Sequence, residues 1–364
     1  MAAPKPASGP DVALQRSGSS LVLTNERVRV VIDERGLLVG LDDHRGRALF
    51  SAERPGNLLQ LHRDLPTEWD AWDLDEHYRQ NVEDLDAPAV IEVVAEDADA
   101  VTVSIRRSFG ASSSEQRITV ARGREVVRIE TDVDWNEREK VLKLAFPFRL
   151  DATESTAETQ FGHVTRPTTT NTSWEEAKFE ICAHRWLHVD EGGYGVGVVN
   201  ATVYGHDVVR DRDGDTPVTV VRQTLLRSPR FPDPQTDQGR HAFVTLLAPG
   251  ADRARTAELG YDLAFPVRER KGTGEVAPLV SVSGAGVLVE TVKLADDRSG
   301  DVVVRLYESR GRRPEVTVRA GFAHHGVARV DLLERGEQAP TPGAFTAVVR
   351  PFELITLRFA RESG

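Results

Sequence analysis

Cysteine is almost absent from this sequence, and its charged residues are biased towards acids. Cys182 is the only cysteine in 364 residues, which excludes an intrachain disulfide and a zinc site built from several cysteines. A single cysteine suits a reducing cytosol. With 57 Asp and Glu against 46 Lys and Arg, the formal net charge is -11, and nucleic-acid binding instead favours a basic face. We therefore expect a cytoplasmic protein with no nucleic-acid partner.

Long apolar runs are also missing, above all near the N-terminus. The first 20 residues, MAAPKPASGPDVALQRSGSS, contain no apolar core of the kind that a signal peptide or a membrane anchor requires. We interpret residues 1–20 as a disordered leader and expect no membrane partner. The total length exceeds what one hydrophobic core usually serves, so at least two packed units are expected.

Strand-like segments are abundant and helix-like segments are few. Short alternating or β-branched stretches recur between Gly, Asp and Pro turns, for example at 28–32, 101–106, 126–133, 194–199 and 355–359. Only 74–85, 175–183 and 252–263 could be helical. Such a pattern favours sheet-on-sheet packing. We predict an all-β fold, with a large β-sandwich at 21–267, a Gly- and Pro-containing linker at 268–278 and a smaller C-terminal β-sandwich at 279–364.

The stretch RDLPTEWDAWDLDEHYRQ, residues 63–80, places two tryptophans among carboxylates. The hydroxyls of a sugar donate hydrogen bonds to carboxylates, and its C–H face packs on an indole ring. Candidate carbohydrate-binding residues are therefore Trp69, Asp70, Trp72 and Asp73. The alternative is that one tryptophan anchors the loop in the core while the acids are solvated. The residues alone leave both interpretations open.

Two further stretches gather polar side chains beside rings or prolines. Residues 160–200 contain His163 and Arg166 and end in a glycine-rich hairpin, and residues 225–241, LLRSPRFPDPQTDQGRH, contain Asp237, Arg240 and His241. Loops on a rigid sheet are where binding groups concentrate. The alternatives are internal hydrogen bonds that tie loops to a sheet, and an ordinary crossover with surface ion pairs.

Long motifs carry a resemblance to a known family over almost the whole chain beyond residue 20. They are GNLLQLHRDLPTEWDAWDLDEHYR from Gly56, FGHVTRPTTTNTSWEEAKFEICAHRW from Phe161, GYGVGVVNATVYGHDV from Gly193, LLRSPRFPDPQTDQGRH from Leu225, VETVKLADDRSGDVVVRLYESRGRR from Val289 and PFELITLRF from Pro351. The chain resembles the C-terminal β-rich part of glycoside hydrolase family 38, the zinc-dependent retaining α-mannosidases of the cytosolic and bacterial type. This resemblance implies a large sandwich of the galactose-mutarotase-like supersandwich type.

The resemblance also implies a division of labour. In the family, an N-terminal catalytic barrel carries the nucleophile and the zinc, and nothing in this chain resembles it. We therefore expect no catalysis by this chain alone, no cofactor in it, and two partners: the missing barrel, in cis or as a separate chain, and an α-mannoside. The residues expected to face the substrate cleft are Trp69, Asp70, Trp72, Asp73, His163, Arg166, Asp237, Arg240 and His241. The alternative function is a stand-alone carbohydrate-binding module.

Overall fold

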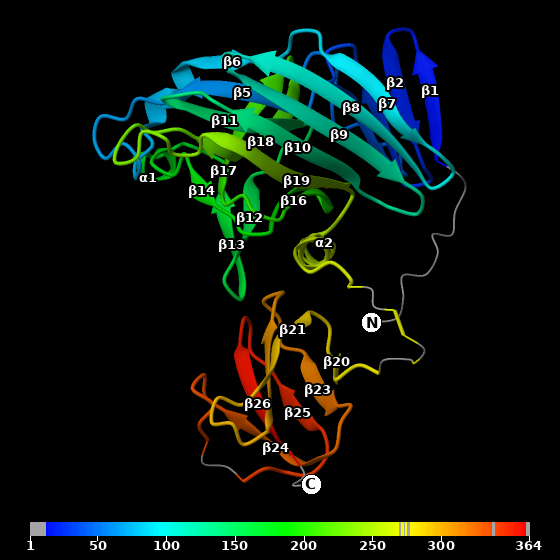
Figure 1. Ribbon diagram of the computed structural model, residues 1–364, viewed down its shortest axis with the longest axis vertical. Helices are drawn as coiled ribbons and strands as arrows, with labels where there is room; N and C mark the ends of the chain where they lie inside the picture. The colour runs from blue at the N-terminus through cyan, green and yellow to red at the C-terminus, as the bar shows by residue number, and fades with distance from the viewer. Residues whose placement is uncertain (1–11, 269–270, 273, 275–276, 337–338, 362–364) are drawn as a thin grey trace. The chain divides into compact units, whose positions relative to one another are not determined.

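The computed structural model describes residues 12–268, 271–272, 274, 277–336 and 339–361. The described chain forms two compact units (Figure 1). The large unit contains residues 12–158 and 165–267. The C-terminal unit contains residues from 268 onward together with residues 159–164. The strands, paired antiparallel throughout the described ladders, confirm the all-β prediction.

Three sheets build the large unit. The four-stranded sheet has the order β1 (Ala13–Ser17), β2 (Ser20–Thr24), β3 (Val28–Ile32), β4 (Leu38–Asp43). The nine-stranded sheet has the order β13 (Gly162–Pro167), β12 (Glu154–Thr159), β15 (Trp186–Glu191), β16 (Tyr194–Asn200), β19 (Gly239–Pro249), β10 (Val127–Trp135), β9 (Ser112–Ala121), β8 (Ala100–Phe109), β7 (Val90–Glu96). The six-stranded sheet has the order β14 (Ile181–Cys182), β17 (Gly205–Asp213), β18 (Thr216–Arg227), β11 (Lys140–Phe148), β5 (Leu58–Arg63), β6 (Val82–Asp84).

The prediction that residues 1–20 form a disordered leader is wrong for its second half. Residues 1–11 lie outside the described residues, but Ala13–Ser17 forms β1 and pairs with β2 from Ala13 opposite Thr24 to Ser17 opposite Ser20. Most side chains of β1 are exposed, so the strand lacks the apolar alternation that would have revealed it. Backbone pairing with the apolar β2 orders it. Of the expected linker, residues 269–270, 273 and 275–276 lie outside the described residues.

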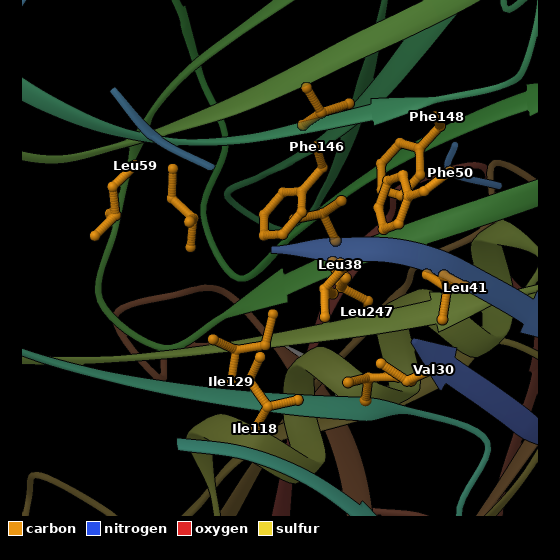
Figure 2. Close-up of a cluster of buried hydrophobic side chains, with 14 of the residues drawn as sticks. Val30, Leu38, Leu41, Phe50, Leu59, Ile118, Ile129, Phe146, Phe148 and Leu247 are labelled. Carbon is orange, nitrogen blue, oxygen red and sulfur yellow. The ribbon is translucent and has the colours of Figure 1, made fainter. Parts of the chain in front are cut away.

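Alternating side chains fill the core of the large unit. Along β10 the inward residues are Val127, Ile129, Thr131, Val133 and Trp135, while the polar residues between them point outward. Figure 2 shows Ile118 and Ile129 near Leu247 and Val30, with Phe146, Phe148 and Phe50 beside them. The rings of Phe50 and Phe148 stack with centroids 5.3 Å apart. Burial of this apolar surface is the main stabilising contribution to the unit.

Helices are few and short: η1 (Glu76–Gln80), α1 (Ser173–Glu176) and α2 (Arg253–Ala264). Each overlaps one of the three segments in which the sequence allowed a helix. Asp252 caps α2 by accepting from the Arg255 amide. Among the described residues, no helix has the length and apolar character needed to cross a bilayer.

The C-terminal unit is a second sandwich with its own core. One sheet has the order β20 (Val280–Ser283), β23 (Glu315–Ala320), β25 (Phe345–Val348), and the other has the order β21 (Val287–Leu294), β22 (Val302–Glu308), β26 (Leu354–Arg361), β24 (His324–Val330). Val304, Leu306, Val318, Leu357 and Phe359 are fully buried between them. The predicted smaller sandwich is thus confirmed.

Candidate functional site

One arginine of β18 holds the tryptophan-containing loop that follows β5. Arg227 donates through Nε to Asp64 Oδ2 at 2.5 Å and through Nη2 to Asp64 Oδ1 at 3.3 Å. The same Nη2 is shared with two carbonyls of the loop, Asp70 O at 2.6 Å and Asp73 O, and Nη1 donates to Ala71 O at 3.3 Å. The Asp64 side chain is 1% exposed, so this bidentate pair is shielded from water.

A reciprocal bond joins this loop to the loop after β18. Asp70 Oδ2 accepts from the backbone amides of Arg230 and Phe231, both at 2.8 Å. The side chain of Arg227, at the end of β18, therefore binds carbonyls of the first loop, and the side chain of Asp70 in the first loop binds amides of the second. We call residues 64–75 and 228–238 together the paired loops. In Figure 1 the paired loops lie at one end of the large unit, close to α1.

Large rings remain in solvent on the paired loops. Trp69 is 67% exposed, Trp72 is 68% exposed and Phe231 is 65% exposed. Trp69 also has φ = 57°, which is uncommon for an aromatic residue, and its carbonyl accepts from the amides of Trp72 and Asp73. The interpretation that one tryptophan anchors the loop in the core is wrong. The loop is anchored by polar contacts, and we call Trp69, Trp72 and Phe231 the exposed rings.

Asp237, Arg240 and His241 lie where the second loop runs into β19. His241 donates from Nε2 to Asp237 O at 2.9 Å, and its ring stacks on Phe243. Arg240 is exposed and lies opposite Asp134 in the ladder of β10 and β19. Arg240 and His241, but not Asp237, line a hollow of about 850 Å³ over the ends of β8, β9, β10 and β19. This hollow mixes arginines and carboxylates, a lining suited to a polar ligand.

His163 and Arg166 do not join the paired loops. His163 groups with the C-terminal unit, where its Nδ1 lies 3.3 Å from Ser309 O and its ring meets Phe352 edge-on at 5.0 Å. Arg166 is half-buried on β13, and its Nη1 is buried without a hydrogen bond in the described part of the chain. The predicted residues thus fall into separate places, and a common cleft-facing role for them stays a prediction.

Behind the paired loops lies a buried charge network that the sequence did not reveal. Lys143 Nζ on β11 lies 2.8 Å from Asp207 Oδ2 and 2.5 Å from Glu180 Oε1. Tyr78 of η1 donates its hydroxyl to the same Glu180, and Arg222 donates to Asp207 Oδ1 at 2.8 Å. Lys143 and Asp207 are fully buried. The network therefore fixes η1 and the segment before β14 onto the outer face of the six-stranded sheet.

Burial and neighbouring charges set the protonation of this network. Burial favours neutral Asp207, but Lys143 and Arg222 outweigh it and lower the pKa of Asp207 to about 2. For Glu180, burial is the largest effect and raises its pKa despite Lys143. Burial disfavours the ammonium of Lys143, yet Asp207 and Glu180 raise its pKa. A lone lysine inside the apolar run VLKLAFPF was the only sequence signal for this site.

Metal ligation finds no support in the residues that the structure describes. Across the described ranges, His, Cys, Asp and Glu side chains form no group of three or more that could hold a metal ion. His188 donates from Nε2 to Ala251 O at 2.9 Å and belongs to no such group. The described residues therefore do not fit the zinc that the resemblance implies for the intact family enzyme.

Family models match both units. The model for the glycosyl hydrolases family 38 C-terminal domain matches residues 23–235, and the model for the family 38 C-terminal β-sandwich domain matches residues 286–357. The chain belongs to glycosyl hydrolase family 38. It corresponds to the C-terminal part of the α-mannosidases of this family, as the sequence motifs indicated.

Individual relatives of family 38 agree with this placement. The chain is 32% identical to "Alpha-mannosidase 2C1" of Homo sapiens over 96% of its own length, and 28% identical to "Alpha-mannosidase G" of Dictyostelium discoideum, also over 96%. It spans about a third of these curated relatives, 34% in both cases. The crystal structure of an α-mannosidase from Enterococcus faecalis V583 superimposes with a TM-score of 0.71 at 17% identity, covering 95% of this chain and 43% of that one, which shows a shared fold.

Proposed function

We propose that this chain is the non-catalytic C-terminal part of a cytoplasmic α-mannosidase, and that it braces a catalytic part and shapes its substrate cleft. The observation that supports the proposal most directly is the pair of clamped loops whose rings stay in solvent. Burying a large apolar side chain contributes about 1.5–3 kcal/mol, so a surface that covers these exposed rings would gain that stabilisation from each of them. The chain's relatives have about two thirds of their length outside the matched region.

Catalysis belongs to that other part in this proposal. Retaining glycoside hydrolysis needs a nucleophilic carboxylate and an acid/base carboxylate about 5–5.5 Å apart. Zinc would bind to the catalytic part, because the described residues offer no ligand group for it. The contribution of this chain is to position the catalytic part and to add polar and aromatic groups beside the α-mannoside. Asp237, Arg240 and His241, near the start of β19, are available for contacts with the α-mannoside.

Reconstitution tests this function. The full chain is mixed with a separately expressed catalytic part of the same enzyme, and association is followed by size-exclusion chromatography with light scattering. We expect one complex that hydrolyses an aryl α-mannoside, while neither component does so alone. Failure to associate at micromolar concentration would argue against the proposal. Binding of mannose oligosaccharides by this chain without any partner would instead favour a stand-alone carbohydrate-binding module.

A further inference from the structure

We propose that Trp69, Trp72 and Phe231 form a docking surface for the catalytic part, and that Arg227 is the residue that positions these rings. The rings insert into an apolar pocket of the catalytic part, and basic residues surround that pocket. This inference rests on the proposed function and adds to it the contact surface, its chemistry and the residue that fixes it. The partner that docks on this surface is the polypeptide that corresponds to the other two thirds of the relatives' length.

The loop conformation depends on Arg227. Carbonyls of Asp70, Ala71 and Asp73 all point at one guanidinium, and that guanidinium is oriented by the buried carboxylate of Asp64. A lysine carries the same charge but lacks the planar fork that serves a carboxylate and three carbonyls together. The turn therefore has its shape, with the left-handed Trp69, because one side chain collects its carbonyls.

The second loop is fixed by the same arrangement from the other side. Asp70 has its backbone carbonyl on Arg227 and its carboxylate on the amides of Arg230 and Phe231. A movement of the tryptophan loop would therefore also release Phe231. In the proposal, these loops hold the three rings as one preset surface, so that the ordering entropy is removed before a partner arrives. Preset aromatic anchors of this kind dominate the binding energy of protein interfaces.

Charge at the rim defines the chemistry of the partner. Glu68, Asp73 and Glu76 are exposed and form no ion pair in the described part of the chain, whereas Arg230 at the rim is paired with Glu139 at 3.2 Å. The surface thus presents apolar rings among these carboxylates, with one further guanidinium, that of Arg138, held against the second loop at Pro234 O. A complementary surface has an apolar pocket for the rings and Lys or Arg around it, and its association rate falls with salt.

Two variants separate positioning from direct contact. Trp72→Ala removes a ring, and Arg227→Lys keeps the charge opposite Asp64 but removes the fork. Their affinities for the catalytic part are measured by surface plasmon resonance. We expect each to weaken binding by tenfold or more. The double variant should lose less binding free energy than the sum of the two single losses, because part of the effect of Arg227→Lys is the misplacement of Trp72, while Trp69 and Phe231 remain to be misplaced.

Matched controls come from the same unit. Arg230→Lys changes a guanidinium that bonds only Glu139, and Tyr204→Ala removes a ring that is 60% exposed but lies outside the paired loops. Both should bind within about threefold of the unchanged chain. The free chain provides a second measurement: 5-fluorotryptophan spectra should show one sharp resonance each for Trp69 and Trp72, and broadened or doubled resonances in Arg227→Lys.

The outcomes distinguish this inference from the proposed function. Wild-type association that is insensitive to Trp72→Ala and Arg227→Lys overturns the docking surface and leaves the function standing. Additive losses, or unchanged fluorine resonances in Arg227→Lys, overturn the positioning role. Absence of any wild-type association overturns the proposed function together with this inference.

Discussion

Lys143 Nζ lies 2.8 Å from Asp207 Oδ2 at a place where neither side chain is exposed to solvent. The lysine belongs to β11 and the aspartate to β17, and β18 lies between these strands in the six-stranded sheet. Glu180 brings a second carboxylate to the same ammonium. A buried charge with two partners makes the outer face of this sheet intolerant of the loss of any one member.

Lys143→Met should destabilise the large unit by about 3–5 kcal/mol, because it removes the ammonium that both buried carboxylates contact and leaves Asp207 with Arg222 and Glu180 with Tyr78. Urea denaturation followed by intrinsic fluorescence measures this loss. Arg29→Met is the matched control, since the Arg29–Asp42 pair is exposed and should contribute less than about 1 kcal/mol. Equal stabilities of Lys143→Met and the unchanged chain would show that the network does not hold the sheet.

Acid should destabilise the large unit through two buried histidines. Burial lowers the pKa of His206 and of His62 to about 4 each. Between about pH 6.5 and pH 4 the unfolded chain binds protons that the folded chain excludes, so stability is complete above this window and falls as pH decreases. Each histidine contributes a slope of about 1.4 kcal/mol per pH unit.

His206→Asn should remove one of these two contributions, which is visible as a shallower fall of unfolding free energy between pH 6.5 and pH 4. His44→Gln, at an exposed position, should leave the slope unchanged. Glu180 acts in the opposite sense because its pKa is raised, but its contribution is common to all three proteins and cancels in the comparison. Identical slopes for His206→Asn and the unchanged chain would show that this histidine does not set the acid sensitivity.

Gly110 connects β8 to β9 in a conformation that excludes a side chain. It has φ = 49°, and a Cβ there would lie 2.3 Å from Glu137 Oε1, which also accepts from the Ala111 amide at 2.7 Å. Gly110→Ala should lower the free energy of unfolding of the large unit by about 1–3 kcal/mol, as measured by thermal denaturation. Gly18→Ala, with φ = 60° and open space around it, isolates the backbone cost. A loss for Gly110→Ala no larger than that for Gly18→Ala would exclude the Glu137 clash.

The strands and the division into two sandwiches follow from local sequence, because alternation in stretches such as Val127–Trp135 is set by residues two apart. The exposed tryptophan loop was also visible, as rings among carboxylates. What holds it was not: Arg227 and Asp64 are separated by 163 positions, and only the completed sheet brings them together. Strand β1 escaped prediction because, of its five side chains, Leu14 alone packs on the core, and backbone pairing with β2 supplies the rest of its order.

The buried network escaped prediction for a related reason. Lys143 lies on the outward face of β11, where a lysine is normally solvated. It is buried because η1 and the segment around Glu180 cover that face. Both segments are short and polar, so their sequences do not predict that they pack on a sheet. The sequence pattern predicts on which face of a strand each side chain lies, but it does not predict which other segments of the chain cover that face.

The division of labour between this chain and a catalytic part is tested most directly by the hydrolysis of an aryl α-mannoside by the purified chain alone, with and without added zinc. We predict no turnover above the uncatalysed background in either condition, because the proposed function assigns the groups that break the glycosidic bond to a separate catalytic part. Robust turnover by this chain alone would show that it carries those groups itself.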